Sequence, residues 1–285
     1  MDSVILIDKP KGLTSQETVT ALKRRLKVKK AGHTGTLDPI ATGLLIVCTG
    51  EATKVSRFLT DLPKQYLATI KLGERTDTFD AEGKVTATGK GNIPEAALRE
   101  AAASFRGRIK QLPPMYSALK VSGRPLYELA RKGIEVEREE REVEVHQLDL
   151  LWYEPPLAGL LITCAKGTYV RTLADDIGQH AGTYAHITEL RRTAIGPFSV
   201  ENSCTPEGLA EKKPGAMLGI DEALGLFLEE AVLNEAQFRR AANGASFRIA
   251  GPLTGYLRIK GSGGVLMGIG KAFCGVVKME RLLHL

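Results

Sequence analysis

Gly32-His33-Thr34-Gly35-Thr36-Leu37-Asp38-Pro39-Ile40-Ala41-Thr42-Gly43 places three glycines in twelve residues and runs directly into Leu44-Leu45-Ile46-Val47-Cys48. An apolar run behind a glycine-punctuated segment predicts a constrained loop followed by a buried strand. Asp38 stands immediately before a proline, where an aspartate commonly begins a turn or caps a helix. By local sequence alone, a structural role for this carboxylate is therefore favoured.

A basic helix is predicted just before this loop. Thr14 and Glu17 have the spacing of a capping box, and apolar residues at positions 19, 22 and 26 fall on one helical face. The polar side carries a cationic run from Lys23 to Lys30, with no acidic residue between Glu17 and Asp38. Taken alone, such a run fits a solvated face as well as a nucleic-acid contact. A short apolar run at 4–7 predicts a buried strand ahead of the helix.

The rest of the first 228 residues mixes strands and helices without a strict alternation. Pro113 and Pro114 predict an extended loop at 112–116, since proline donates no backbone hydrogen bond. The charged stretch at 135–144 is expected to start exposed and become an edge strand. Strands are predicted at 66–72 and 160–164, and helices at 94–105, 126–132 and 172–180. This pattern favours an α+β fold with a mixed, largely antiparallel sheet.

The composition changes near residue 229. A helix is predicted from Asn234 to Gly244, and residues 244–285 hold nine glycines between short β-like runs. This is typical of a small all-β barrel. We therefore predict two domains, 1–228 and 229–285. Because 57 residues form only a small core, the second is expected to pack on the first.

Composition indicates a soluble cytoplasmic protein. The 285 residues include 39 Lys and Arg against 33 Asp and Glu, a net charge of +6 that allows a polyanionic partner without proving one. The four cysteines form no CxxC pair, so neither a zinc site nor a disulfide framework is expected. The longest mostly apolar stretch, 157–165, is too short to cross a membrane, and the N-terminus is too short in apolar residues for a signal peptide.

Several familiar catalytic motifs are absent from the sequence. It contains no GxxxxGK[ST], GxGxxG or GxSxG segment, and its five histidines are scattered. What remains is one carboxylate, Asp38, with Arg171 and the tyrosines Tyr66 and Tyr169. Singly, the arginine fits a surface ion pair and the tyrosines fit core aromatics. None of them identifies an activity alone.

Together these residues fall in motifs that resemble those of one enzyme family. Six segments resemble, in order, motifs of the TruB-type tRNA pseudouridine synthases: 9–15, 32–43, 66–80, 113–127, 166–171 and 190–192. The resemblance implies the pseudouridine synthase catalytic domain, with an RNA-contacting insertion at about 112–141. The C-terminal segment is similar to the PUA barrel often fused to these enzymes. The implied activity is isomerisation of uridine 55 in the tRNA T-loop.

The resemblance also implies roles at the site. Asp38 matches the essential aspartate, which attacks C1′ or C6, and Arg171 matches its partner, since an opposite charge nearby favours the charged carboxylate. Tyr66 matches the tyrosine that stacks on the target base, and Tyr169 and Leu190 match pocket walls. Only one carboxylate is implied. Because product and substrate are isomers, no cofactor or metal is expected.

A stacked uridine must be flipped out of the RNA to reach this site. His33 resembles the residue that fills the vacated stack. In this context we assign Lys23, Arg24 and Lys27 to phosphate contacts and Lys9, of the Lys-Pro motif, to substrate binding. The expected partner is the T-arm stem-loop of tRNA, with the PUA-like segment on the acceptor stem. A monomer without a protein partner suffices.

Two other functions use the same sequence features. A tRNA-binding or remodelling chaperone would open the RNA without requiring catalysis. A guide-RNA-dependent synthase would carry a larger C-terminal region and partner proteins. The intact set of Asp38, Tyr66 and Arg171 favours the enzyme.

Overall fold

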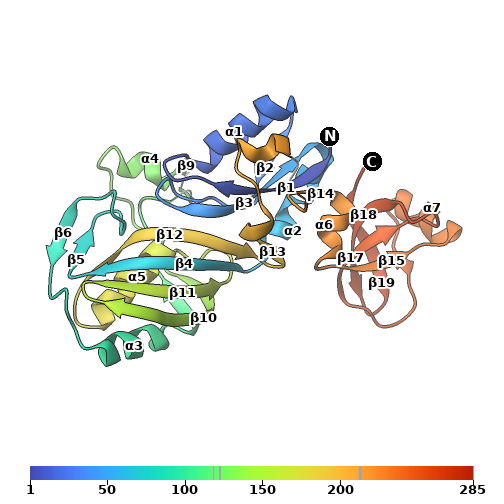
Figure 1. Cartoon of the computed structure of the whole chain (residues 1–285). Coiled ribbons are helices and arrows are strands. Elements are labelled where there is room, and N and C mark those ends of the chain that lie inside the picture. The colour runs from blue at the N-terminus through green and yellow to red at the C-terminus, as the bar shows by residue number, and fades with distance from the viewer. Residues whose placement is uncertain (118, 122, 212–213, 285) are drawn as a thin grey trace.

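The main body of the protein is a ten-stranded sheet. The computed structural model describes residues 1–117, 119–121, 123–211 and 214–284. The strands of this sheet are β1 (Ser3–Lys9), β2 (Ala31–His33), β3 (Thr42–Thr49), β4 (Lys64–Leu72), β7 (Gly107–Gln111), β10 (Arg141–Glu154), β11 (Leu157–Cys164), β12 (Ala185–Ile195), β13 (Phe198–Ser199) and β14 (Met217–Gly219). Their order is β14-β1-β3-β12-β4-β11-β10-β7, with β2 beside β3 and β13 beside β12 (Figure 1). Among the described strand pairs of this sheet, β12 with β3 alone is parallel, as a largely antiparallel sheet requires.

Helices pack on both faces of the sheet. The helices are α1 (Ser15–Leu26), α2 (Ser56–Thr60), α3 (Glu95–Ser104), α4 (Leu126–Ala130), α5 (Val170–His180), α6 (Ile220–Gly225) and α7 (Glu235–Ala242), with 3-10 turns η1 (Gly50–Lys54), η2 (Val200–Asn202) and η3 (Gly208–Glu211). Apolar side chains of α3 and α5 share one core with β4, β10, β11 and β12. The capping box of Thr14 and Glu17 at the start of α1 is confirmed. In the ranges described, no helix combines the length and apolar character needed to cross a bilayer.

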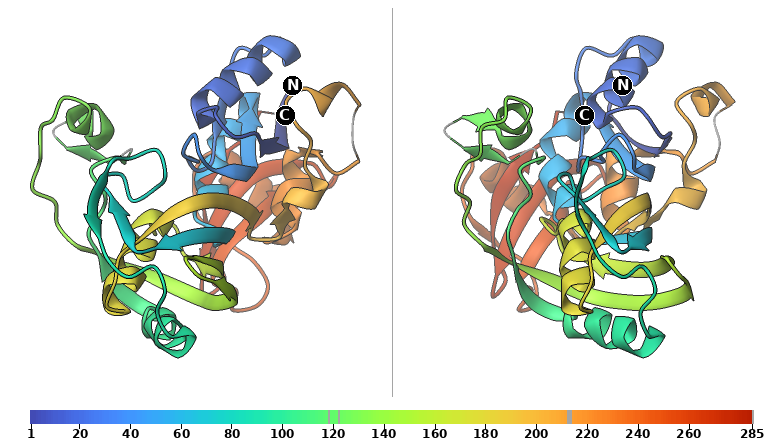
Figure 2. Two further views of the ribbon diagram at one scale, coloured as in Figure 1. Left: turned by 60° about the vertical axis from the view of Figure 1, so that its left-hand side comes forward. Right: turned by 90° about the vertical axis from the view of Figure 1, so that its left-hand side faces the viewer.

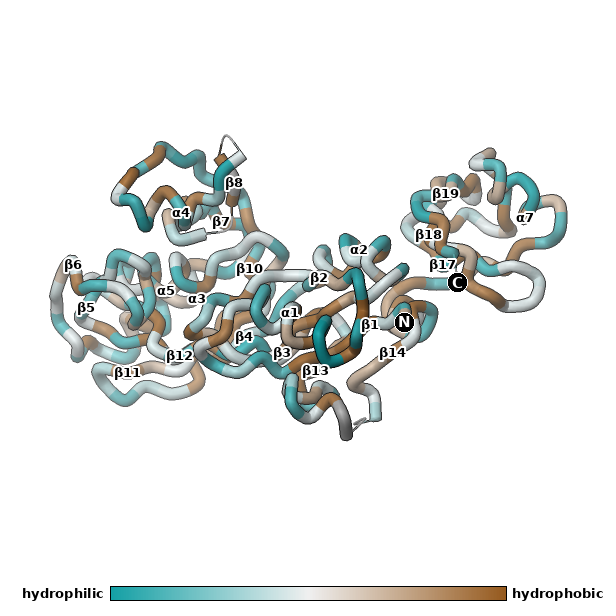
Figure 3. Tube along the Cα trace, turned by 90° about the horizontal axis from the view of Figure 1, so that it is seen from above, coloured by the Kyte–Doolittle hydropathy of each residue, from teal (hydrophilic) through white to brown (hydrophobic). Residues whose placement is uncertain are grey.

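Two chain segments project from the sheet. A hairpin of β5 (Glu74–Thr76) and β6 (Val85–Thr88) follows β4. Between β7 and β10, an insertion containing β8 (Lys120–Val121), β9 (Arg124–Pro125) and α4 stands away from the sheet (Figures 2 and 3). Residues 135–140 are mostly exposed, as predicted. The strand predicted at the end of the stretch 135–144 is present as the start of β10, but it is not an edge strand, because the sheet order places β10 between β11 and β7.

The C-terminal segment folds into its own five-stranded sheet. Its strands are β15 (Glu229–Val232), β16 (Phe247–Arg248), β17 (Gly255–Lys260), β18 (Leu266–Phe273) and β19 (Val276–Leu282), in the order β15-β17-β18-β19-β16. This module packs on the main body, as expected. Leu266, Ile269 and Leu283 belong to the same buried cluster as residues of β1 and β3. The rings of Phe58 and Tyr256 meet edge to face at 4.9 Å across this junction.

Candidate active site

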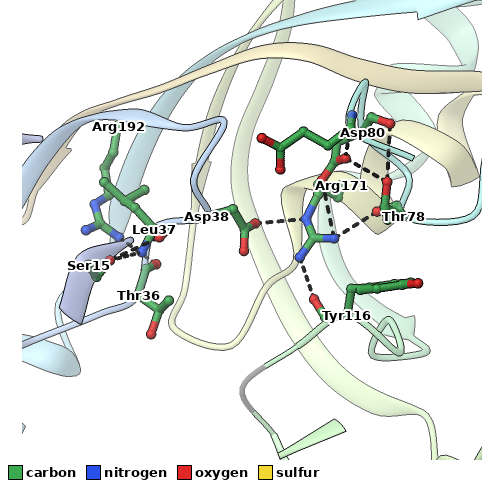
Figure 4. Close-up of polar contacts among 10 residues, drawn as sticks. Ser15, Thr36, Leu37, Asp38, Thr78, Asp80, Tyr116, Arg171 and Arg192 are labelled. Atoms are coloured by element: carbon green, nitrogen blue, oxygen red, sulfur yellow. Dashed lines mark hydrogen bonds and ion pairs between the residues drawn. The ribbon is translucent and has the colours of Figure 1, made fainter. Parts of the chain in front are cut away.

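Three chain segments converge on the guanidinium of Arg171, in the first turn of α5 (Figure 4). Its Nε donates to Asp38 Oδ2 at 2.8 Å, its Nη1 to the carbonyl oxygen of Thr78 at 2.8 Å, and its Nη2 to that of Tyr116 at 2.7 Å. The arginine side chain is 5% exposed and that of Asp38 is 35% exposed. The buried guanidinium of Arg171 therefore links the glycine-rich loop, the β5–β6 hairpin and the insertion. It also orients the carboxylate of Asp38, which is partly exposed.

A second carboxylate lies at the same arginine. Asp80 Oδ2 is 3.5 Å from Arg171 Nη1, and its Oδ1 accepts hydrogen bonds from the Thr78 hydroxyl at 2.6 Å and the Glu82 N–H at 3.1 Å. Asp80 is buried. No role for Asp80 was predicted from the sequence. The signal was present, because Asp80 ends the segment 66–80 that carries the family resemblance.

Arg192 holds the loop that presents Asp38. Its buried side chain donates Nε to the carbonyl oxygen of Leu44 at 2.7 Å and Nη2 to that of Gly35 at 3.1 Å, while Nη1 lies 3.5 Å from that of Thr36. Three carbonyls from the loop and its following strand thus share one guanidinium. Arg192 ends the segment 190–192 of the family resemblance, and no such role was predicted for it.

Two further features fix the loop. The hydroxyl of Ser15, at the start of α1, accepts from the Leu37 N–H at 2.7 Å and donates to the Leu37 carbonyl at 3.0 Å. Gly43 has φ +100°, and a Cβ there would lie 2.3 Å from the carbonyl oxygen of Arg192, because β3 and β12 pair at these two residues. Only glycine fits this crossing. Both Leu37, the residue before Asp38, and the end of the loop at Gly43 are therefore held in fixed positions.

Two cavities meet at Asp38 and Arg171. The first, here called the Tyr66 cavity, measures about 280 Å³, and the second, the His33 cavity, about 460 Å³. Asp38, Arg171 and Ser117 line both cavities, and the lining of the Tyr66 cavity also includes Thr34, Tyr66, Tyr169, Leu190 and Arg192. The His33 cavity is lined by His33, Thr78, Asp80, Ser117, Tyr127 and Arg131. The carboxylate thus stands where two cavities meet, and each cavity has both aromatic and cationic side chains in its lining.

The three predicted pocket residues gather in the Tyr66 cavity. Tyr66 and Leu190 are buried, and burial raises the pKa of the Tyr66 phenol. Tyr169 caps α5 and is held through its backbone, since its N–H donates to Gln111 Oε1 at 2.8 Å and its carbonyl accepts from Gln111 Nε2 at 3.1 Å. No sequence signal pointed to Gln111, whose strand β7 was not predicted.

The predicted substrate contacts have different surroundings. Burial, with a smaller effect of Arg192, lowers the pKa of His33, which lines its cavity. Lys9 is fully buried, and its Nζ donates to the carbonyl oxygens of Pro10 at 2.9 Å and Leu13 at 2.7 Å. Burial lowers the pKa of Lys9 to about 8. Its ammonium thus holds the turn between β1 and α1.

The basic residues lie in the last turn of α1 and at its C-cap. Lys23 is half-buried, whereas Arg24 and the capping Lys27 are exposed. Within the described residues, none of the three forms a salt bridge with a carboxylate. The helix that holds Leu37 through Ser15, its first residue, therefore presents cations without a carboxylate partner at its opposite end.

Known proteins share this arrangement of elements. Residues 23–170 match the TruB family pseudouridylate synthase N-terminal domain, and residues 171–224 match the tRNA pseudouridylate synthase B C-terminal domain. The chain is 46% identical over 275 residues to tRNA pseudouridine synthase B of Aromatoleum aromaticum, covering 95% of this chain and 89% of that protein. It is 44% identical to the protein of that name from Burkholderia pseudomallei, covering 99% and 97%.

Solved structures resemble the whole fold. A Cbf5-Nop10-Gar1 complex contains a chain with a TM-score of 0.76 and 28% identity, covering 98% of this chain and 84% of that one. An H/ACA RNP bound to a substrate RNA containing 2′-deoxyuridine contains one with a TM-score of 0.75 and 26% identity, covering 99% and 85%. The family domains, the near-full-length relatives and the fold therefore agree with one another. The chain belongs to the TruB family of pseudouridylate synthases.

Proposed function

We propose that this enzyme converts uridine 55 in the T-loop of tRNA to pseudouridine, with Asp38 as the nucleophile. The observation that carries the proposal is the 2.8 Å ion pair between Asp38 and Arg171, placed where the Tyr66 and His33 cavities meet. The tRNA substrate follows the names of the relatives, which are tRNA pseudouridine synthases.

The chemistry needs a carboxylate and a dry, shaped cavity. The N1–C1′ bond of the nucleotide breaks, the uracil turns, C5 bonds to C1′, and the proton on C5 is replaced by one on N1. Asp38 assists by bonding to C1′ or C6, and Arg171 keeps its oxygen aimed. Tyr66 stacks on the base, while Tyr169 and Leu190 close the cavity around it. Atoms and charge balance without a further reactant.

Access requires the uridine to leave the RNA stack, at a cost of a few kcal/mol. We assign His33 to filling the vacated position and the Tyr66 cavity to receiving the base. Lys23, Arg24 and Lys27 contact phosphates, which orients the RNA without reading its sequence. Lys9 serves the substrate indirectly, by holding the turn before α1.

We assign the remaining RNA contacts to the insertion and to the C-terminal sheet. The insertion around 112–141 grips the T-arm, and the C-terminal sheet, as a PUA-like module, reaches the acceptor stem. The enzyme acts as a monomer, without a partner protein.

The test is mass-spectrometric mapping of pseudouridine in unmodified tRNA and in a T-arm stem-loop, each incubated with this protein alone. We expect modification at position 55 in both, and none with Asp38→Ala, which keeps its fold and its tRNA affinity. Tritium release from C5-labelled uridine gives the rate. Modification at another position overturns the site assignment, and full activity of Asp38→Ala overturns the nucleophile. RNA binding without modification by the wild-type protein would favour a remodelling function.

A further inference from the structure

Two buried hydroxyls in the Tyr66 cavity have no hydrogen-bond partner in the described parts of the chain. They belong to Thr34, which is 1% exposed, and Ser117, which is 5% exposed. Both residues line the cavity. Buried polar atoms in folded proteins are almost always paired, because an unpaired one lowers stability. Two such hydroxyls on one small cavity therefore require an explanation.

The backbone fixes both residues while leaving their hydroxyls unpaired. The Thr34 N–H donates to the Ile46 carbonyl at 3.0 Å, in the register that joins the glycine-rich loop to β3. The Ser117 carbonyl accepts from the Tyr127 N–H at 3.1 Å, and the preceding Tyr116 carbonyl accepts from Arg171. The two side chains thus come from opposite segments, the loop of Asp38 and the insertion, and border the same space.

A uracil ring in this cavity needs partners of this kind. Its polar edge carries two carbonyl oxygens and one N–H, which lose water and their pairing partner when the base is flipped out. The wall formed by Tyr66 and Leu190 offers a ring face and an apolar side chain for stacking and packing. A hydroxyl both donates and accepts, so it can serve either a carbonyl or the N–H of the ring.

We propose that the hydroxyls of Thr34 and Ser117 hydrogen-bond to the polar edge of the flipped uracil and help to select it. This inference rests on the proposed function, because it takes the Tyr66 cavity as the site of the base. Within the described residues neither hydroxyl has a protein partner, and the bound uracil supplies one. They are substrate-binding residues of the reaction centred on Asp38.

The first experiment separates this role from a structural one. Thr34→Val and Ser117→Ala each remove an unpaired hydroxyl, so thermal stability is expected to stay equal or rise. At the same time kcat/KM is expected to fall by about 2- to 12-fold per variant, the worth of one hydrogen bond. Thr34→Ser keeps the hydroxyl and is expected to retain the wild-type kcat/KM.

The matched control is Thr49→Val in β3. Thr49 is equally buried, but its hydroxyl accepts from the Ser3 N–H at 3.1 Å and donates to the Ser3 carbonyl at 3.3 Å. This variant should therefore lose stability and keep kcat/KM. If Thr34→Val and Ser117→Ala behave as this control does, or leave kcat/KM unchanged, the inference is wrong.

The second experiment locates the contact on the base. RNAs carrying 2-thiouridine or 4-thiouridine at the target position replace one carbonyl oxygen by sulfur, a poorer acceptor. If a hydroxyl bonds that oxygen, the wild-type penalty for one analogue should disappear in the corresponding variant, as in a double-mutant cycle. Additive penalties for both analogues in both variants overturn the inference. Failure of the wild-type enzyme on the uridine RNA would instead refute the proposed function.

Discussion

Replacing Arg171 by lysine keeps the positive charge but removes the planar guanidinium, whose N–H groups donate in several fixed directions. The guanidinium serves three acceptors in three directions, Asp38 Oδ2 and the carbonyls of Thr78 and Tyr116, at 2.7 to 2.8 Å. An ammonium on a flexible stem cannot hold the same geometry, so we expect it to keep one of the three. Two lost bonds from a charged donor are worth about 3 kcal/mol at the low end of their range, which corresponds to roughly a 100-fold loss in kcat/KM.

Tritium release from labelled tRNA measures this loss, and a thermal melt reports the accompanying change in stability. Arg75→Lys is the matched control. Arg75 Nη2 pairs with Asp175 Oδ2 at 2.9 Å and ties the same hairpin to the same helix, away from Asp38. We expect the control to stay within about twofold of wild type, because a lysine preserves a single ion pair. If kcat/KM of Arg171→Lys lies within about tenfold of the wild-type value, the hypothesis that the guanidinium positions Asp38 is wrong.

Three further predictions follow from the surroundings of the site. Ser15→Ala leaves the Leu37 N–H without its acceptor at 2.7 Å, so urea unfolding should show a loss of about 1–3 kcal/mol, and kcat should fall with an unchanged RNA KM; an unaltered kcat would contradict the idea that this bond positions the loop. The pKa of Lys9 is lowered to about 8, so the native state releases this proton before the unfolded state does, and the stability of wild type relative to Lys9→Met should rise between pH 7 and pH 10 by on the order of 2 kcal/mol; a pH-independent difference would show that the ammonium is not desolvated. The double variant Arg24→Gln, Lys27→Gln should reduce the slope of log affinity for tRNA against log salt by about 1.5, with kcat unchanged, and an equal slope would remove these residues from the phosphate contacts.

Local signals in the sequence predicted local structure well. The capping box at Thr14 and the alternation at 66–72 each depend on residues a few positions apart, so they survive without knowledge of the fold. Strand β7 was missed because residues 107–111 pair with β10 some thirty positions later. Because this pairing is not visible in the sequence, the charged stretch at 135–144 was predicted to end in an edge strand.

The same distinction applies to the site: roles carried by sequence motifs were predicted, and roles that depend on contacts between distant residues were not. Asp38 and Arg171 are 133 positions apart, and their pairing was predicted through the family resemblance. Asp80 and Gln111 were not assigned roles, because their importance comes from what they contact in space. Arg192 likewise gains its role only when β12 runs beside β3 and brings its guanidinium under the loop carbonyls.

The shared core at the junction limits how far this enzyme can be shortened. Leu266, Ile269 and Leu283 complete a buried cluster whose other members include residues of β1, β3, α2 and α6. Truncating the chain before residue 229 to obtain a minimal catalyst would therefore expose an apolar patch on the remaining domain. Exposed apolar patches of this kind promote aggregation. Any attempt to exchange the module for another RNA-binding unit has to carry these three side chains, or replacements of matching volume, into the graft.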